Sequence, residues 1–568
     1  MKKLTRALTL LLAVVMLFAL AACGGGSGTP TNTQTPSGNN DQPSKPGADK
    51  DSSQTVTIPE GALTGSGKHG GTGYVQDSIQ KDLVRVAATD VPSNVSPWTG
   101  TTSGRHQTMY SVYQPLFEFD KTTGERVLVL AETIEQTDEL TYRVKLREGI
   151  VDSDGKTVTA DDAVFSVKTC AELGNVSGMK YIEDVQKIDD LTLDIVMNTT
   201  ADYQFNSSVS MIFIVSQASY EASSDGMNTQ AVGTGPYKMT DFASGSSLTL
   251  VKVDNYWGSP LNDRENNDAW YYFAQNVDKI EYTKVSEASQ ASIALETGNV
   301  DVAYQMTSKE ADRMKENKDF NVWSTVDTKS FNLFFNCGEL SPMGNQLLRQ
   351  AVCYAVDADG VRKANGGYGV LSTTFGAAVF ADCNPEWANE DYYSYNPEKA
   401  KELVAESGFD TNTSIRLMVA SNSKECLTAA QVVQGYLMAI GLKVQIDEYD
   451  GASFATYRYD ETMYDIRIQD SSFSCLADIW TQFLSAGKKD KSYAQMKDEH
   501  LEELLAALGT AEGRNAENVD AAHEYIKDQA FVYGLYCRQQ FDTTTADILE
   551  FVYMPKLFAM PGAFCYSK

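Results

Sequence analysis

The chain has 568 residues, of which 42% are hydrophobic, and 47 basic against 76 acidic side chains give it a formal net charge of −29. Single hydrophobic cores rarely grow beyond roughly 250 to 300 residues, so this length predicts two or more lobes. A strongly negative surface repels phosphate backbones and anionic lipid heads. This composition therefore disfavours nucleic acid as a partner and a membrane held by charge alone.

Residues 1–22 have the pattern of a secretory signal peptide. Lys2, Lys3 and Arg6 precede an apolar run at 7–22, which is shorter than the roughly 20 residues that span a bilayer comfortably. The run ends in LAAC at 20–23, followed by glycines. This ending resembles the bacterial lipoprotein box, which implies a lipid on Cys23. We therefore expect an extracytoplasmic protein that its lipid anchors to the cell membrane.

Residues 23–80 are expected to be the lipidated cysteine and a flexible tether. No aromatic residue occurs between 24 and 73, where Gly, Ser, Thr, Pro, Asn and Asp dominate. Such a segment buries too little apolar surface to offset the entropy lost on ordering. Residues 1–80 hold six basic and five acidic side chains, so residues 81–568 carry −30. The acidic part of the chain is the predicted folded body.

The folded body is expected to alternate strands and helices. Asn396, followed by proline, is a helix start, and Gly408 a helix end; Thr159 and Asp162 have the spacing of a capping box. Hydrophobic periodicity predicts strands at 82–88, 142–146, 442–449 and 464–468 and helices at 286–297 and 427–440. This alternation predicts an α/β fold with right-handed crossovers.

Motifs for catalysis or metal binding are missing from the sequence. The four histidines include no H-E-x-x-H, no serine lies in G-x-S-x-G, and the eight cysteines after Cys23 include no C-x-x-C. Residues 152–163 fit neither a phosphate-binding loop nor a calcium loop. We expect no cofactor, no metal and no enzymatic activity. A hydrolase with a spatial triad stays open as an alternative, and the cysteines are either paired in disulfides or free.

Several segments together resemble one known family. They are LVRVA at 83–87, NVSP at 94–97, VYQPLF at 112–117, LREG at 146–149, DGKTVTADD at 154–162, GTGPY at 233–237, NYWG at 255–258 and LRQAVCYAVD at 348–357. Their order and spacing are similar to those of the family 5 extracellular solute-binding proteins, the peptide-binding components of ABC importers. The similarity extends over residues 83 to about 545.

The resemblance implies a fold and a division into domains. The fold would be the α/β periplasmic-binding-protein type with two hinged lobes (type II, cluster C-like) and an additional domain on the first lobe. Domain I would comprise residues 81–118, 230–310 and 531–568, domain II residues 119–229, and domain III residues 311–530. The protein would be a monomer that closes on its ligand and delivers it to the permease subunits of an ABC transporter.

The resemblance also implies where a ligand is bound. Aligning the family's closing aromatic-aliphatic pair with residues 483–484 puts Leu476 at the position of the family's amine-binding Asp, so Asp470 and Asp478 become the candidates for that role. Trp98, Phe473 and Trp480 are further cleft candidates, and Arg105 is a candidate for binding a carboxylate. For each residue, core packing or a solvated surface position stays open. Peptide is the leading ligand, and the alternatives are an oligosaccharide, an opine-like compound and a metal chelate.

Overall fold

The computed structural model describes residues 79–99, 102–173, 176–485, 494–555 and 558–567. All of them belong to one compact unit, residues 54–568. The predicted signal peptide, Cys23 and the tether up to residue 78 lie outside the described residues. Residues 79 and 80, predicted as the end of the tether, belong to the body, since the Ile79 N–H donates to the Tyr566 carbonyl at 3.1 Å. In the part that is described, no helix has both the length and the apolar character needed to cross a membrane.

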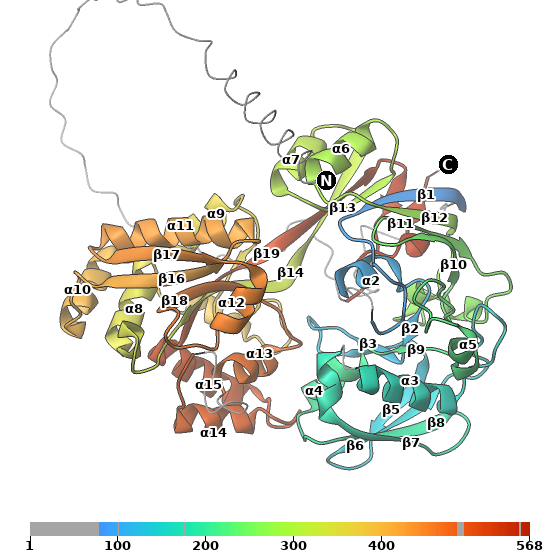
Figure 1. Ribbon diagram of the computed structural model, residues 1–568, viewed down its shortest axis with the longest axis horizontal. Coiled ribbons are helices and arrows are strands. Elements are labelled where there is room, and N and C mark those ends of the chain that lie inside the picture. The colour runs from blue at the N-terminus through green and yellow to red at the C-terminus, as the bar shows by residue number, and fades with distance from the viewer. Residues whose placement is uncertain (1–78, 100–101, 174–175, 486–493, 556–557, 568) are drawn as a thin grey trace, which may run out of the picture. The chain divides into compact units, whose positions relative to one another are not determined.

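A mixed sheet of eleven strands organises the body (Figure 1). One group comprises β10 (Tyr237–Ala243), β11 (Ser247–Lys252), β12 (Val277–Lys284), β1 (Lys81–Ala88) and β13 (Val302–Met306). The other comprises β18 (Ile466–Ser471), β16 (Ser414–Ala420) and β17 (Lys443–Tyr449). Between the groups lie the long strands β19 (Val532–Thr545), with β15 (Val370–Leu371) at its side, and β14 (Phe320–Phe335). These two strands are therefore the connection between the groups.

Separate hydrophobic cores define two lobes. The first lobe contains β1, β10 to β13 and the C-terminal strands β20 (Ile548–Glu550) and β21 (Cys565–Tyr566), and its core includes Val84, Tyr237 and Phe564. The second lobe contains β16 to β18, and its cores include Leu333, Leu417 and Trp480. The structure is thus a two-lobed α/β fold, as the sequence predicts.

Residues 131–197 contain a smaller sheet of the first lobe, with the strand order β5 (Ala131–Gln136), β6 (Thr141–Leu146), β8 (Thr192–Met197) and β7 (Ile182–Lys187). Its helical elements are α3 (Ala160–Leu173), η1 (Ser177–Tyr181), α4 (Asp202–Val209) and α5 (Gln217–Ala222). Two strand pairs flank it, β2 (Gln114–Pro115) with β9 (Phe213–Ile214) and β3 (Phe117–Phe119) with β4 (Arg126–Leu128). This sheet shares its core with the first lobe, because Tyr142 and Leu193 belong to the same cluster as Val84.

The remaining helices cover the sheets of the two lobes. In the first lobe they are α2 (Thr102–Thr108) and α6 (Ala288–Glu296), followed by α7 (Ser308–Lys315), which contacts both long strands. In the second lobe they are α8 (Gln346–Ala355), α9 (Ala358–Ala364), α10 (Pro397–Ser407), α11 (Lys424–Ala439), α12 (Gly451–Tyr457), α13 (Leu476–Leu484), α14 (Glu499–Ala507) and α15 (Ala516–Gln529). Helix α11 packs on β16 and β17 (Figure 1).

The local signals read from the sequence are confirmed at the ends of these elements. The Asn396 side chain accepts the Lys399 N–H at 3.0 Å, and α10 ends at Gly408 with a left-handed φ of 70°. At the start of α3, the Asp162 carboxylate accepts the Thr159 N–H at 2.7 Å, which is one half of a capping box. Strand β18 differs in its bounds, since it runs to Ser471 rather than ending at 468.

The cysteines of the body are unpaired. Cys170, Cys337, Cys353, Cys383, Cys426, Cys475, Cys537 and Cys565 are all free thiols. Six of the eight side chains are buried, as is usual for free cysteine, which packs as a small hydrophobe. Of the two possibilities that the sequence leaves open, the structure has the free cysteines.

An ion pair ties the C-terminal strand β20 to the rest of the first lobe. The Arg264 guanidinium donates to both carboxylate oxygens of Glu550, at 2.8 and 2.6 Å, and lies 3.9 Å from the Trp270 ring centroid. The Glu550 side chain is only 1% exposed. Its charge therefore depends on Arg264, because a buried carboxylate without a counter-charge is strongly disfavoured.

We expect Arg264→Ala to lower the free energy of unfolding by about 3 kcal/mol, since breaking a buried pair leaves one charge uncompensated. The matched control is Arg143→Ala. Arg143 also binds both oxygens of an acid, Asp194, but is 44% exposed, so its loss should be less than about 1 kcal/mol. Urea unfolding followed by tryptophan fluorescence measures both. Equal losses for the two variants would contradict the role given to Arg264.

Candidate functional site

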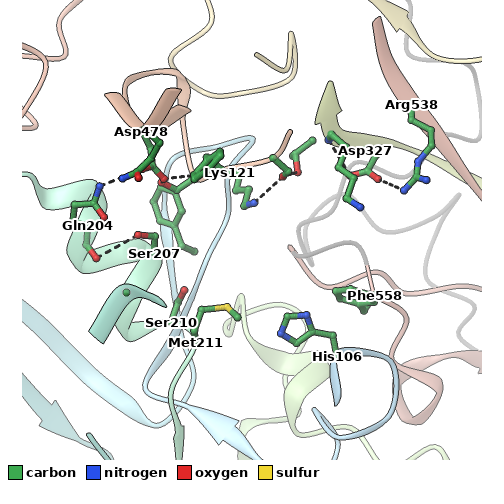
Figure 2. Close-up of a pocket in the computed structure, with 18 of the residues that line it drawn as sticks. His106, Lys121, Gln204, Ser207, Ser210, Met211, Asp327, Asp478, Arg538 and Phe558 are labelled. Atoms are coloured by element: carbon green, nitrogen blue, oxygen red, sulfur yellow. Dashed lines mark hydrogen bonds and ion pairs between the residues drawn. The ribbon is translucent and has the colours of Figure 1, made fainter. Parts of the chain in front are cut away.

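A cavity of about 710 Å³ lies between the two lobes (Figure 2), a size typical of small-molecule sites. The first lobe contributes His106, Phe119, Lys121, Gly178, Lys180, Tyr181, Gln204, Ser207, Ser210, Met211, Gln305 and Phe558. The second lobe contributes Ser472, Phe473, Ser474, Asp478 and Gln482, and the two long strands add Asp327, Thr328, Lys329, Arg538 and Gln540. Both lobes and both long strands therefore contribute side chains to the wall of the cavity.

A register shift in the long strands builds one side of this wall. Val326 pairs with Gln539 and Ser330 with Cys537, so three residues of β14 oppose the single residue Arg538 of β19. These three residues, 327–329, all line the cavity. Arg538 donates to the Asp327 carboxylate at 2.8 Å, as Figure 2 shows. Bulges of this kind re-aim side chains next to functional sites, and here the bulge directs a charged segment of the hinge at the cavity.

Asp478 lies in the opposite wall, in the first turn of α13. Its Oδ2 accepts the Ser474 N–H and O–H at 3.2 and 2.7 Å, and its Oδ1 accepts the Gln204 Nε2–H at 3.2 Å (Figure 2). The residue is 3% exposed. Burial raises the pKa of Asp478, because the carboxylate loses hydration, while the hydrogen bonds from Ser474 act in the opposite direction. Groups of the protein thus already bind both oxygens of this carboxylate.

The amides at the start of α13 are also bound by the protein. The Asp382 carboxylate accepts the Leu476 N–H at 2.9 and 3.0 Å and the Ala477 N–H at 3.3 Å. The Cys475 sulfur accepts the Asp478 N–H at 3.4 Å. A helix N-terminus favours a negative charge, and Asp382 supplies it. Leu476, which alignment with the family puts at the amine-binding position, thereby has its backbone N–H bonded to an acid from 94 residues earlier in the chain.

Helix α4 of the first lobe contacts the second lobe beside the cavity. Asp202 pairs with Arg514 at 2.5 Å, and the two side chains are 13% and 14% exposed. Tyr203 packs into a core of the second lobe and donates its hydroxyl to Thr481 at 3.4 Å. Gln204, also in α4, donates its Nε2–H to the Asp478 carboxylate of the second lobe. The lobes therefore meet across the cavity as well as through the long strands.

The structure places the residues predicted from sequence in three kinds of surroundings. Phe473 and Asp478 line the cavity. Asp470 is outside the lining and lies 3.7 Å from the ammonium of Lys329, which lines it. The remaining three are buried in the cores: Trp98 donates to the Phe213 carbonyl, Trp480 to the Phe375 carbonyl and Arg105 to the Pro97 carbonyl. These three side chains, predicted from sequence as candidates for the cleft, are therefore not part of the cavity wall.

Sequence reasoning missed most of the polar side chains of the cavity. Lys121 follows β3, Lys180 lies in η1, Gln204 in α4 and Lys329 in the bulge of β14. No two of these positions are neighbours in the sequence, and none lies in a recognisable motif. The sequence signal that marks part of the site is the family block VYQPLF at 112–117, which leads into β3.

One group among the described residues has the donor atoms for a metal ion: Glu390, His523 and Glu524. Lys527 pairs with Glu390 at 2.8 Å and with Glu524 at 2.5 Å, so a cation is already present between the carboxylates. Burial lowers the pKa of His523 to about 4, and its ring stacks on Trp387 at 3.8 Å. These contacts account for the three side chains as part of the packing of the second lobe, without a metal ion.

Two lobes joined by a pair of strands, with a cavity of mixed polar and aromatic lining between them, have the architecture of a solute receptor. The sequence pattern of the bacterial extracellular solute-binding proteins, family 5, matches residues 125–491. The chain belongs to this family. It is thus an extracytoplasmic substrate-binding protein of an ABC importer and not an enzyme.

Individual proteins are similar to the chain over most of its folded part. It is 25% identical over 387 residues to the glutathione-binding protein GsiB of Pectobacterium atrosepticum, covering 66% of this chain and 70% of that protein. It is 27% identical over 385 residues to heme-binding protein A of Haemophilus influenzae, covering 60% and 65%. The crystal structure of a putative peptide-binding protein AppA from Clostridium difficile superposes with a TM-score of 0.72 at 19% identity, covering 85% of this chain and 100% of that one.

We expect Asp478→Asn to keep ligand affinity within about twofold, because Ser474 and Gln204 already bind the carboxylate. The amide oxygen of asparagine can accept both Ser474 bonds, and its N–H can donate to the Gln204 oxygen once the Gln204 amide turns over. The folded chain holds the Asp478 proton more tightly than the unfolded chain. The contribution of Asp478 to the free energy of unfolding therefore falls as the pH rises from 3.8, the ordinary pKa of the group, through its raised pKa in the folded chain. Asparagine removes this loss, so the unfolding midpoint at pH 7 should stay equal or rise.

Isothermal titration calorimetry and thermal unfolding measure both effects. The control is Asp478→Ala, which leaves Ser474 and Gln204 without their acceptor and should cost roughly 1–3 kcal/mol of stability. One outcome would contradict this prediction. If Asp478→Asn abolishes binding of peptides with a free amine but not of N-acetylated peptides, then Asp478 is the amine-binding group.

Proposed function

We propose that this protein is a lipid-anchored receptor that captures a short peptide between its lobes and delivers it intact to an ABC permease. The observation that carries the proposal is the chemistry of the cavity wall. Hydroxyl and amide side chains form a large part of it, among them Ser207, Ser210, Ser472, Gln305 and Gln482. Such groups donate to and accept from a peptide main chain, which offers both kinds of partner at every residue.

Aromatic side chains complete the wall and support the same proposal. Phe119, Tyr181, Phe473 and Phe558 line the cavity, and the Phe558 ring lies 5.1 Å from that of His106. Flat apolar surfaces of this kind receive peptide side chains, while the polar groups fix the main chain. Similarity to a glutathione-binding protein and to a putative peptide-binding protein points in the same direction.

A metal chelate is the second candidate, because one similar protein binds heme. A heme needs wide apolar faces, whereas in this wall hydroxyl, amide and charged side chains stand among the aromatic ones. Peptide is therefore the better fit. We further propose the division into domains I, II and III at residues 118/119, 229/230, 310/311 and 530/531, with residues 119–229 as the additional domain.

The full-length protein should bind tri- to pentapeptides from a mixture and release them with unchanged mass. Native mass spectrometry identifies the bound species, and the same mixture is offered with glutathione and with heme as competitors. Peptides shortened during the incubation would contradict the delivery of an intact ligand. If the protein retains heme and no peptide, the ligand is a metal chelate and not a peptide.

The lipid anchor has its own test. In bacterial cells, Cys23→Ser should stop the incorporation of labelled fatty acid into the protein and move it from the membrane fraction to the medium or periplasm. Cys170→Ser, which changes a buried thiol of the folded body, is the matched control and should keep the label. Unchanged labelling of Cys23→Ser would contradict the anchor.

A further inference from the structure

The charge of the cavity wall is opposite to the charge of the body. The chain carries −29 overall. Among the described residues that line the cavity, however, four are permanent cations, Lys121, Lys180, Lys329 and Arg538, whereas the carboxylates are Asp327 and Asp478. The lining itself therefore has an excess of positive charge in an otherwise acidic protein, while Glu425, 3.6 Å from Arg538, and Asp470, 3.7 Å from Lys329, lie just outside it. Walls of low dielectric concentrate the field of such charges within a cavity.

Both carboxylates of the lining have partners within the protein. Asp327 accepts from Arg538 at 2.8 Å and from the Lys329 N–H at 3.1 Å. Asp478 accepts from Ser474 and Gln204 and is almost fully buried. Binding a ligand cation at either acid would require breaking these hydrogen bonds. The lining therefore offers an incoming ammonium group no carboxylate that is not already bonded.

The three lysines come from different segments of the chain, and all three line the cavity. Lys121 donates to Ser472 at 3.3 Å, and the Lys180 ammonium lies 4.6 Å from the Tyr181 ring centroid. The Lys329 ammonium lies 3.7 Å from Asp470, with the two side chains 46% and 40% exposed, a pair that contributes little in water. An ammonium has three donors, so a lysine that already contacts a protein group still has capacity to bind a carboxylate oxygen.

We propose that the ligand is a short peptide of net negative charge, with side-chain carboxylates that the lysines at 121, 180 and 329 bind. This inference rests on the proposed peptide receptor and makes it specific. It also reverses the expectation from sequence that an acid of this protein anchors the ligand's amine. The acidic body would repel an anion at a distance, and the lysines offset that repulsion inside the cavity.

Three tripeptides test the inference on the full-length protein: Ala-Glu-Ala, Ala-Gln-Ala and Ala-Lys-Ala. They share a backbone and differ in net charge, and Glu and Gln also share their shape. Titration calorimetry at low salt should give an affinity about tenfold higher for the Glu peptide than for the Gln peptide, and weaker binding of the Lys peptide. The advantage of the Glu peptide should shrink at about 0.3 M salt, since added ions screen exposed charges.

Substitution of the lysines separates charge from shape. Lys180→Gln and Lys329→Gln should each lower the affinity for the Glu peptide at least threefold and leave that for the Gln peptide unchanged. The control is Lys168→Gln, which removes the same charge from a 55% exposed lysine of the first lobe that does not line the cavity, and it should change neither affinity.

The outcomes distinguish this inference from the function on which it rests. Equal affinities for the Glu and Gln peptides, or unchanged affinities in both lysine variants, would overturn the anionic ligand and leave the peptide receptor standing. If none of the three peptides binds, both proposals are contradicted.

Discussion

The antiparallel pairing of β14 and β19 is the constraint on which the rest of the structure depends. The two strands pair from Phe320 with Thr545 to Phe334 with Val532, and each lobe attaches its own sheet to one side of this pair. A lobe can therefore move only as far as this hinge allows. The pairing loses register at 327–329, where Arg538 holds the bulge through Asp327. The same element thus connects the lobes and contributes charge to the cavity.

Much of the fold was predictable because its signals are local. Caps such as Asn396, glycines with a left-handed backbone such as Gly408, and alternating strands such as 142–146 all act within a few residues of the chain. Strand order was not predictable from such signals. The placement of β14 between β19 and β18, for example, depends on pairings across more than 130 residues of sequence. The resemblance to a family supplied what the local signals could not.

The site was less predictable than the fold, for a related physical reason. Phe473 and Asp478 lie in the segment identified by the resemblance and do line the cavity. Trp98 and Trp480 are in comparable segments, but their large rings pack in the cores, and nothing in their sequence neighbourhood distinguishes the two outcomes. The lysines of the wall gave no signal, because a solvated surface lysine and a lysine of a cavity have the same sequence context. Only the folded chain brings 121, 180 and 329 to one wall.

Closure of the lobes follows from how the wall is shared between them. A ligand shifts an equilibrium between open and closed forms only by binding one of them more tightly. Here the lysines at 121 and 180 belong to the first lobe and Lys329 to the hinge strand, so a ligand that contacts all three favours the form in which they converge. The contacts of α4 act in the same direction without a ligand, since Asp202 and Arg514 join the lobes through a largely buried pair. A bound ligand therefore adds its own contacts to those of α4, and it shifts the balance between the two forms only by its difference in affinity for them.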